Sequence, residues 1–558
     1  MNKSAEFIPK LWTCLKEGYS FLFFKSDLLS GITVGIIALP LAMAFAIASG
    51  VGPERGLWTA IVAGFLISAL GGSRVQIGGP TGAFVVLVFD VVQRGGYAGL
   101  AASTLVASLI LILLGLFRLG SWIKYVPHSL VTGFTTGIAL LIFSSQIRDF
   151  FSLQMDFVPA SFVRKWMGYF YALPTLNLAG FCIGVGTLLL ILAIRKWAPR
   201  IPWGIAGIVA ATAVVSCFQL PVETIQSRFG VLPRTLPVPS LPYFGGLNLQ
   251  QVLFDAIAIA LLGGIESLLS AVIGDGMMGG RHRSNCELIA QGIANFGSVL
   301  FGGIPATGAI ARTAANVKTG AKTPVSGIIH AFALFTIMAF FAPWVSKIPL
   351  AALAAILMMV AWNMSELHHF TRLLRGPKED RLILLTAFLL TVFVDITFAI
   401  VLGMIIASLL FMKQMSNLSK IAPVFQENNP SSSHLSIPAG VEVYEVEGPF
   451  FFGAADILKD FLRGLVPTPK VFVLQMDQVP FIDASGLNAL QEFYEVSEKR
   501  GSHVIFAGVR PEVNHQLKKF GLLERIGEQR VCLHLNAALE LARQIVENSS
   551  LPNNPASR

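Results

Sequence analysis

The stretch GSVLFGGIPATGAI (297–310) repeats the pattern of the earlier stretch ISALGGSRVQIGGPTGAF (67–84). Each has an apolar segment, a Gly-Gly pair, a proline and then Thr-Gly-Ala. In an apolar chain, glycine and proline interrupt a helix and leave backbone polar groups that need partners. The recurrence predicts equivalent interruptions in two copies of a larger unit, although small residues at both places also suit close helix packing.

The composition indicates that most of the chain lies in a lipid bilayer. Of its 558 residues, 54% are hydrophobic and only 13% are charged, whereas a soluble protein carries about 25% charged residues. The first 27 residues contain scattered charges and no uninterrupted apolar core, so no cleaved signal peptide is predicted. The five cysteines show no regular spacing, and neither a metal site nor a disulfide framework is predicted.

Apolar blocks up to about residue 415 predict fourteen membrane spans. Several are shorter than the ~20 residues that a full crossing needs. The third and the tenth, which follow the two interruptions, are the shortest. The predicted spans are residues 31–48, 57–71, 80–92, 97–117, 126–144, 177–195, 201–220, 253–274, 286–301, 307–317, 324–345, 349–363, 381–395 and 397–414.

The loop charges predict the orientation of these spans. An even number of spans places both termini on one side, and the loops on that side are much richer in Lys and Arg than the opposite loops. This bias identifies the side of the termini as the cytoplasm. It also accounts for the net charge of +9 without nucleic acid, because no basic run has interleaved aromatic residues.

The two interruptions are separated by seven predicted spans, and an odd offset inverts the second copy in the membrane. Inverted repeats with short, Gly/Pro-interrupted spans at matching positions are typical of secondary transporters, whose binding site lies near the bilayer midplane. The sequence therefore predicts a transporter with its site at the two interruptions.

The character of the sequence changes after residue 415. A polar stretch rich in serine and proline predicts a linker, and the alternating strand-like and amphipathic segments that follow predict a soluble α/β domain. The predicted strands are 441–448, 471–477 and 503–509, and the predicted helices are 454–465 and 485–501. The expected division is a cytoplasmic N-terminal segment (1–27), a transmembrane domain (28–416), a linker (417–439), the α/β domain (440–545) and a disordered tail (546–558).

The chain resembles the sulfate permease family of anion transporters, the solute carrier 26 group. The residues that carry the resemblance are GITVGIIALPLAMAFAIASGVGPERGLW (31–58), GGPTGAF (78–84), GGIESLLSAVIGDGM (263–277), the stretch 285–327 and FIDASGLNAL (481–490). The last is similar to the signature of the STAS domain, the fold of anti-sigma-factor antagonists. IARTAANV (310–317) and AWNMSE (361–366) most resemble the bacterial branch that carries C4-dicarboxylates.

The resemblance implies a polytopic α-helical membrane protein of two inverted seven-span repeats, with half-helices at spans 3 and 10 and a C-terminal STAS domain. Spans 1–4 and 8–11 would form a mobile core, and spans 5–7 and 12–14 a gate and dimer scaffold. It further implies a homodimer in the cell membrane, here a bacterial inner membrane, without a cofactor.

The candidate anion site is built from the two half-helix N-termini. Their unpaired N–H groups and partial positive charge suit an anion, and the second half-helix is expected to begin at Pro305 to Gly308. Arg312 adds a full positive charge whose planar fork fits carboxylate or sulfate oxygens; alternatively it extends to the cytoplasmic side or pairs only with Glu266. The candidate binding residues here are Pro80, Thr81, Gly82, Ala83, Thr307, Gly308, Ala311 and Arg312.

Other site residues follow from the resemblance. Glu266 lies mid-span and is similar to the acidic residue that family members use for cation coupling, with Glu suggesting a proton. We hypothesise that its protonation releases Arg312 to bind an anion; a static Glu266–Arg312 pair is the alternative. Leu41 and Phe45, one turn apart after Pro40, are implied to flank the anion, or they pack as an apolar helix does.

Asp483 and Ser485 are the candidate regulatory residues of the α/β domain. They lie at a predicted strand-to-helix turn, where Ser485 is expected to cap the helix. The resemblance implies that the matching serine is phosphorylated in free-standing relatives. A scaffold, dimerisation or docking role toward a cytoplasmic partner is the other expectation for this domain.

The leading functional prediction is secondary active, proton-coupled uptake of sulfate or C4-dicarboxylates by alternating access, with bicarbonate as a further candidate. The alternatives are an uncoupled anion exchanger or channel, and a regulatory protein that signals through its STAS domain. A nucleobase carrier would need polar side chains in the pocket rather than Arg312. An enzyme is not predicted, because the sequence shows no nucleophile–base pair, phosphate loop or metal cluster.

Overall fold

The computed structural model describes residues 5–121, 126–155, 158–159, 161–198, 202–242, 245–424, 437–451, 458 and 468–550. The chain forms two compact units, Met1–Ile405 and Ile406–Arg558. Helix α18 (Ile396–Leu418) contains the boundary between them.

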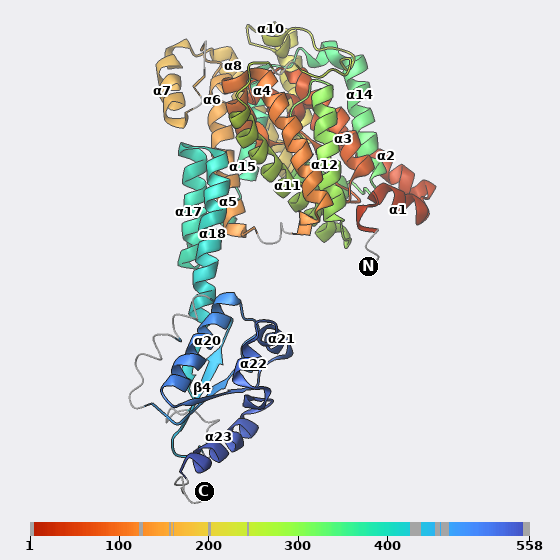
Figure 1. Cartoon of the computed structure of the whole chain (residues 1–558). Coiled ribbons are helices and arrows are strands. Elements are labelled where there is room, and N and C mark those ends of the chain that lie inside the picture. Colours follow the sequence, from red (N-terminus) through yellow and green to blue (C-terminus); the bar gives the residue numbers. More distant parts are fainter. Residues whose placement is uncertain are drawn as a thin grey trace, which may run out of the picture. The chain divides into compact units, whose positions relative to one another are not determined.

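The first unit is helical (Figure 1). Its helices are α1 (Lys10–Lys16), α2 (Phe21–Ala48), α3 (Pro53–Leu70), α4 (Gly82–Leu116), α5 (His128–Ser145), α6 (Ile147–Phe150), α7 (Phe162–Ala172), α8 (Leu178–Trp197), α9 (Trp203–Phe218), α10 (Ile225–Phe229), α11 (Leu249–Met278), α12 (Ser284–Leu300), α13 (Ile310–Lys318), α14 (Val325–Val345), α15 (Leu350–Met364), α16 (Leu367–Leu374) and α17 (Lys378–Phe393).

Every predicted span overlaps a helix, and eight helices in the described residues are long and apolar enough to cross a membrane. The third and fourth predicted spans form the two halves of α4. The backbone there bends at Gly96, whose φ of 60° and ψ of −167° suit only glycine. That all fourteen segments cross the bilayer stays a prediction.

Local signals explain where individual helices begin and end. Asn248 starts α11, because its side chain accepts hydrogen bonds from the amides of Gln250 and Gln251 at 3.1 and 3.3 Å. The helix ends at Gly279, a left-handed residue with φ 72°. Inside the unit α4 packs along α11 and α12, while α2 packs against α3 and α14.

The two interruptions found in the sequence pair with each other. Strand β1 (Gly78–Gly79) and strand β2 (Thr307–Gly308) form an antiparallel ladder, with Gly78 opposite Gly308 and Gly79 opposite Thr307. The ladder therefore joins two segments that are far apart in the sequence.

The second unit contains a five-stranded sheet in the order β3-β4-β5-β6-β7. Its strands are β3 (Lys420–Pro423), β4 (Val441–Glu447), β5 (Val471–Gln475), β6 (His503–Ala507) and β7 (Val531–Cys532). Only the β3–β4 pairing is antiparallel. The helices are α20 (Ala484–Lys499), α21 (Pro511–Lys519), α22 (Leu522–Ile526) and α23 (Leu535–Ser550).

Alternate residues of the central strands supply two apolar cores. Phe472 and Leu474 of β5 pack with α20, α21 and α22, whereas Val471 and Val473 pack with α23. A strand buried on both faces reads as a continuous apolar run, which is why 471–477 and 503–509 were recognisable as strands.

The structure adds detail at the ends of this unit. Strand β3 lies inside the predicted linker, and α23 continues to Ser550, five residues into the predicted tail. The predicted helix 454–465 lies outside the described residues apart from Leu458.

Candidate functional site

The ladder sets the geometry of the candidate site. Strand β1 leads through Pro80 and Thr81 into α4, and β2 leads through Ala309 into α13. Because the strands are antiparallel, the two helices leave the ladder in opposite directions with both N-termini beside it. Neither N-terminus is capped by the side chain of its N-cap residue, so first-turn N–H groups of both helices have no side-chain partner there.

The second half-helix begins later than predicted. Thr307 and Gly308 belong to the ladder and not to the helix, and α13 starts at Ile310. The hydroxyl of Thr307 donates a 2.9 Å hydrogen bond to the carbonyl of Gly263 in α11. Pairing with β1 holds these residues extended, and local sequence gives no sign of that distant partner.

Arg312 lies in the first turn of α13 and is only 3% exposed. Its Nη2 donates to the backbone carbonyl of Pro80, directly before α4. A Cβ on Gly79 would lie 2.6 Å from Nη1 of this arginine, and Nη1 has no hydrogen-bond partner among the described residues. The guanidinium is therefore buried at the ladder with one donor group unused.

Glu266 approaches the same segment from α11. The hydroxyl of Thr81, the N-cap residue of α4, donates a 2.8 Å hydrogen bond to Oε2 of Glu266. In the described part of the chain no ion pair joins Glu266 to Arg312. The static Glu266–Arg312 pair, which the sequence left open, is thus not formed here. Instead Arg312 contacts Pro80, and Glu266 contacts the adjacent residue Thr81.

The remaining candidate residues on α4 and α13 differ in exposure. Gly82 and Ala83 are buried in the first turn of α4, where a Cβ on Gly82 would meet Sδ of Met364 at 2.8 Å and Cδ1 of Ile142 at 3.3 Å. Ala311 is exposed on the surface of the unit.

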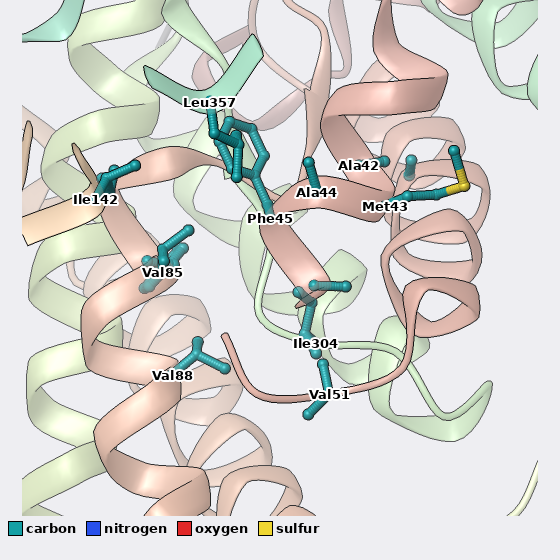
Figure 2. Close-up of a cluster of buried hydrophobic side chains, with 14 of the residues drawn as sticks. Ala42, Met43, Ala44, Phe45, Val51, Val85, Val88, Ile142, Ile304 and Leu357 are labelled. Carbon is teal, nitrogen blue, oxygen red and sulfur yellow. The ribbon is translucent and has the colours of Figure 1, made fainter. Parts of the chain in front are cut away.

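Leu41 and Phe45 lie on α2 within the main apolar cluster of this unit. Phe45 is 5% exposed, and Leu41 is partly buried against the same cluster. Figure 2 shows the ring of Phe45 next to Leu357 of α15, with Val85 of α4 and Ile142 of α5 in the same cluster. These side chains form an apolar layer directly beside the first turn of α4.

Sequence reasoning missed a polar network beneath the ladder. Gln76 donates to Ser267 at 2.8 Å, and Ser267 donates to Oε1 of Glu287 at 3.2 Å. The 1% exposed carboxylate of Glu287 also accepts from Gln291 and from the amide of Gly72. The available signal was an acidic residue inside a predicted span. Glu287 in the span 286–301 meets this criterion, as Glu266 does in the span 253–274.

In the second unit the helix cap differs from the prediction. Asp483, not Ser485, is the N-cap of α20, and its carboxylate accepts a 2.8 Å hydrogen bond from the amide of Gly486. Ser485 is an exposed residue of the first helical turn. Asp is as good an N-cap residue as Ser, and here the helix begins after Asp483, the earlier of the two.

Two family signatures match the sequence. The sulfate permease family matches residues 24–387, and the STAS domain matches residues 434–538.

Two similar bacterial proteins extend along almost the entire chain. The Bacillus subtilis protein named "Putative sulfate transporter YvdB" is 40% identical over 93% of this chain and 98% of its own length. The bicarbonate transporter BicA of Picosynechococcus is 28% identical over 94% of this chain and 95% of its own.

Solved structures show the same fold. The murine solute carrier 26 family member A9, an anion transporter, superposes with a TM-score of 0.87 over 98% of this chain and 95% of that chain, at 19% identity. The transmembrane domain of a cyanobacterial bicarbonate transporter BicA gives a TM-score of 0.59 at 30% identity, over 70% of this chain and 98% of that domain.

Proposed function

The chain belongs to the sulfate permease family of anion transporters, and from this premise we propose that it imports sulfate together with a proton by alternating access. Sulfate leads because a relative 40% identical over nearly the full length is named for it. C4-dicarboxylates, to which IARTAANV and AWNMSE point, and bicarbonate, for which BicA is named, are the competing substrates.

One observation carries this proposal: between the ladder and α4, Arg312 donates to the backbone carbonyl of Pro80, and Glu266 accepts from the side-chain hydroxyl of the next residue, Thr81. A cation and a titratable carboxyl therefore act on the same helix N-terminus. An oxyanion bound there would meet first-turn N–H groups, the positive end of a helix and a guanidinium, which together form an anion site.

The coupling step follows from the Thr81–Glu266 hydrogen bond. An ionised Glu266 accepts from the Thr81 hydroxyl and adds a negative charge beside the site, which opposes an incoming anion. A proton on Glu266 removes that charge and lets its hydroxyl group donate instead. Binding of the proton and of the anion then favour each other, and this reciprocity is what symport requires.

The architecture of the proposal rests on the antiparallel ladder, which is the relation that two inverted copies would have. We propose fourteen spans in two inverted seven-span repeats, with both termini in the cytoplasm of a bacterial cell and the protein in the inner membrane. The proposal includes a homodimer and a STAS unit, residues 440–545, that docks a cytoplasmic partner or is regulated at Asp483 and Ser485.

Radiolabelled uptake into proteoliposomes with an imposed pH gradient tests the function. Sulfate, bicarbonate and succinate are compared in parallel, and the expected result is accumulation of sulfate when the outside is acidic. In Glu266→Gln accumulation should stop responding to the gradient while exchange of labelled for unlabelled anion continues. Glu287→Gln is the matched control, because it makes the same change in a buried carboxyl that does not contact Thr81.

Two results would contradict the proposal. Equilibration of wild-type liposomes without regard to the gradient would favour an uncoupled exchanger or channel. Gradient-driven accumulation that persists in Glu266→Gln would remove this residue from coupling.

A further inference from the structure

A cavity of about 510 Å³ lies in the first unit on the predicted outer side, and its lining residues include none from the ladder. It is lined by the C-terminal end of α2, the early turns of α4, the end of α5, helix α7 and the end of α17. Ile47, two residues after Phe45, and Val85, two residues after Ala83, are among its lining residues. Because Val85 also belongs to the apolar layer of Figure 2, the cavity reaches that layer.

Lys165 of α7 faces this cavity and is unusual in being only 6% exposed. Its ammonium lies 5.4 Å from the centre of the Phe89 ring, a cation–π contact. Among the described residues it has no acidic partner. Burial lowers the pKa of Lys165 to about 8, because desolvation disfavours the charged ammonium.

The other charged residues that line the cavity differ in whether they have partners. Arg148 has a buried Nε without a hydrogen-bond partner in the described residues. The acids are each engaged: Asp149 pairs with Arg228 at 2.8 Å, Asp90 pairs with Arg94 at 2.6 Å, and Asp395 accepts from the amide of Phe398 at 3.3 Å. In the described lining, Lys165 thus lacks an acidic partner and Arg148 keeps one unpaired donor, while Arg228 pairs with Asp149 and Glu223.

We propose that Lys165 and Arg148 form an outer anion-binding site, in which a small oxyanion is held before it passes the apolar layer around Phe45 and Val85. A buried ammonium without a counter-charge is costly, and a divalent or monovalent oxyanion supplies that charge together with hydrogen-bond acceptors. The Phe89 face keeps the ammonium in place when the site is empty. This inference rests on the proposed anion transport, because it assigns the first binding step of that function.

The outer site changes the apparent affinity for the anion on the external side of the membrane. An anion captured from outside is concentrated at the entrance, so the external KM depends on Lys165 while the maximal rate of the later steps does not. Anions leaving from the cytoplasmic side meet this site last, and their half-saturating concentration is unaffected.

Uptake measured with right-side-out vesicles tests the kinetic consequence. In Lys165→Met we expect the external KM for sulfate to rise about tenfold with little change in maximal rate, whereas Lys165→Arg stays within about twofold of wild type. Arg164→Met, which removes the same charge from the exposed neighbouring residue, should leave KM unchanged. An unchanged KM in Lys165→Met, or a loss of maximal rate alone, would overturn the proposal.

Direct binding separates this site from transport itself. Lysines of the full chain in an uncharged detergent are reductively methylated with ¹³C, which keeps their positive charge, and the resonance missing from Lys165→Arg identifies Lys165. Sodium sulfate, added at constant ionic strength with gluconate, should shift this resonance saturably. No shift in a protein that transports sulfate overturns the outer site and leaves the proposed function standing. A saturable shift in a protein that does not transport sulfate supports the site and refutes the proposed substrate.

Discussion

The hydroxyl of Thr81 donates a 2.8 Å hydrogen bond to Oε2 of Glu266, so the residue that begins α4 is tied to a carboxyl on α11. At most helix starts the Ser or Thr hydroxyl accepts from the first-turn amides. Here the hydroxyl is turned to a carboxylate and does not cap the helix. Under the proposed function, a proton on Glu266 would change this hydrogen bond at the N-terminus of α4.

Thr81→Val removes that donor without changing the size of the side chain much. Hydrogen bonds to a charged group contribute about 1.5–3 kcal/mol, so loss of the bond disfavours the ionised carboxylate. Proton-driven uptake should then persist to higher external pH, with a profile displaced by about one to two units. Thr81→Ser keeps the hydroxyl and should keep the wild-type profile. The measurement is initial uptake against external pH, and identical profiles for the valine and serine variants would refute the role assigned to this bond.

Arg312→Ala should weaken anion binding strongly and raise the KM of uptake. The guanidinium is buried at the ladder, and truncating one member of a buried charged contact costs about 2–5 kcal/mol, which corresponds to a KM increase of about 30-fold or more. Arg312→Lys retains the charge but not the planar fork, and an intermediate KM is expected. Lys318→Ala, at the exposed end of the same helix, is the control. Full activity of Arg312→Ala in folded protein would exclude direct anion contact.

The positions of most helices in the first unit could be predicted, because each of these helices corresponds to a local apolar segment of the sequence. Each predicted span overlaps a helix, and the third predicted span, 80–92, begins two residues before α4, which starts at Gly82. The second was misplaced because Thr307 and Gly308 pair with strand β1 far away in sequence, and a two-residue ladder leaves no periodic signal.

The candidate site was predictable in its charged residues and not in their contacts. Intramembrane charge singled out Glu266 and Arg312, but only the structure shows that they hold Thr81 and Pro80 rather than each other. Lys165 belongs to a short amphipathic helix, α7, that had been assigned to a loop. Its burial depends on tertiary packing, which local sequence does not encode.

Gly308→Ala should destabilise the ladder. A Cβ at this position would lie 1.7 Å from Nε2 of Gln76, which donates to Ser267, so the network beneath the ladder must move. Overpacking of this kind costs about 1–3 kcal/mol, and the melting temperature of the detergent-solubilised protein should fall by several degrees. Gly186→Ala, with no atom within 4 Å of its Cβ, is the control; it lies inside α8, where alanine favours the helix, and should melt no lower than wild type. Equal melting of both variants would argue against a tight ladder.

Asp483→Ala should loosen the start of α20, whereas Ser485→Ala should not. The Asp483 carboxylate accepts from the Gly486 amide, and loss of an N-cap costs about 1 kcal/mol. Hydrogen exchange on the full chain should therefore be faster at Gly486 in Asp483→Ala only. If Ser485→Ala alone accelerated exchange there, the serine would be the cap in solution.

The external KM for sulfate should depend on pH through Lys165. Burial lowers the pKa of Lys165 to about 8, so its ammonium predominates below that pH and the neutral amine above it. The external KM for sulfate should therefore rise as the outside pH increases from about 7 to about 9, with a midpoint near the lysine pKa. Lys165→Arg keeps its charge throughout this range and should flatten that part of the profile.

Because proton coupling through Glu266 also responds to pH, the measurement is made as sulfate exchange in Glu266→Gln, with equal pH on both sides. A rise that survives unchanged in the double variant Glu266→Gln/Lys165→Arg would assign the titration to another group and remove Lys165 from the entrance.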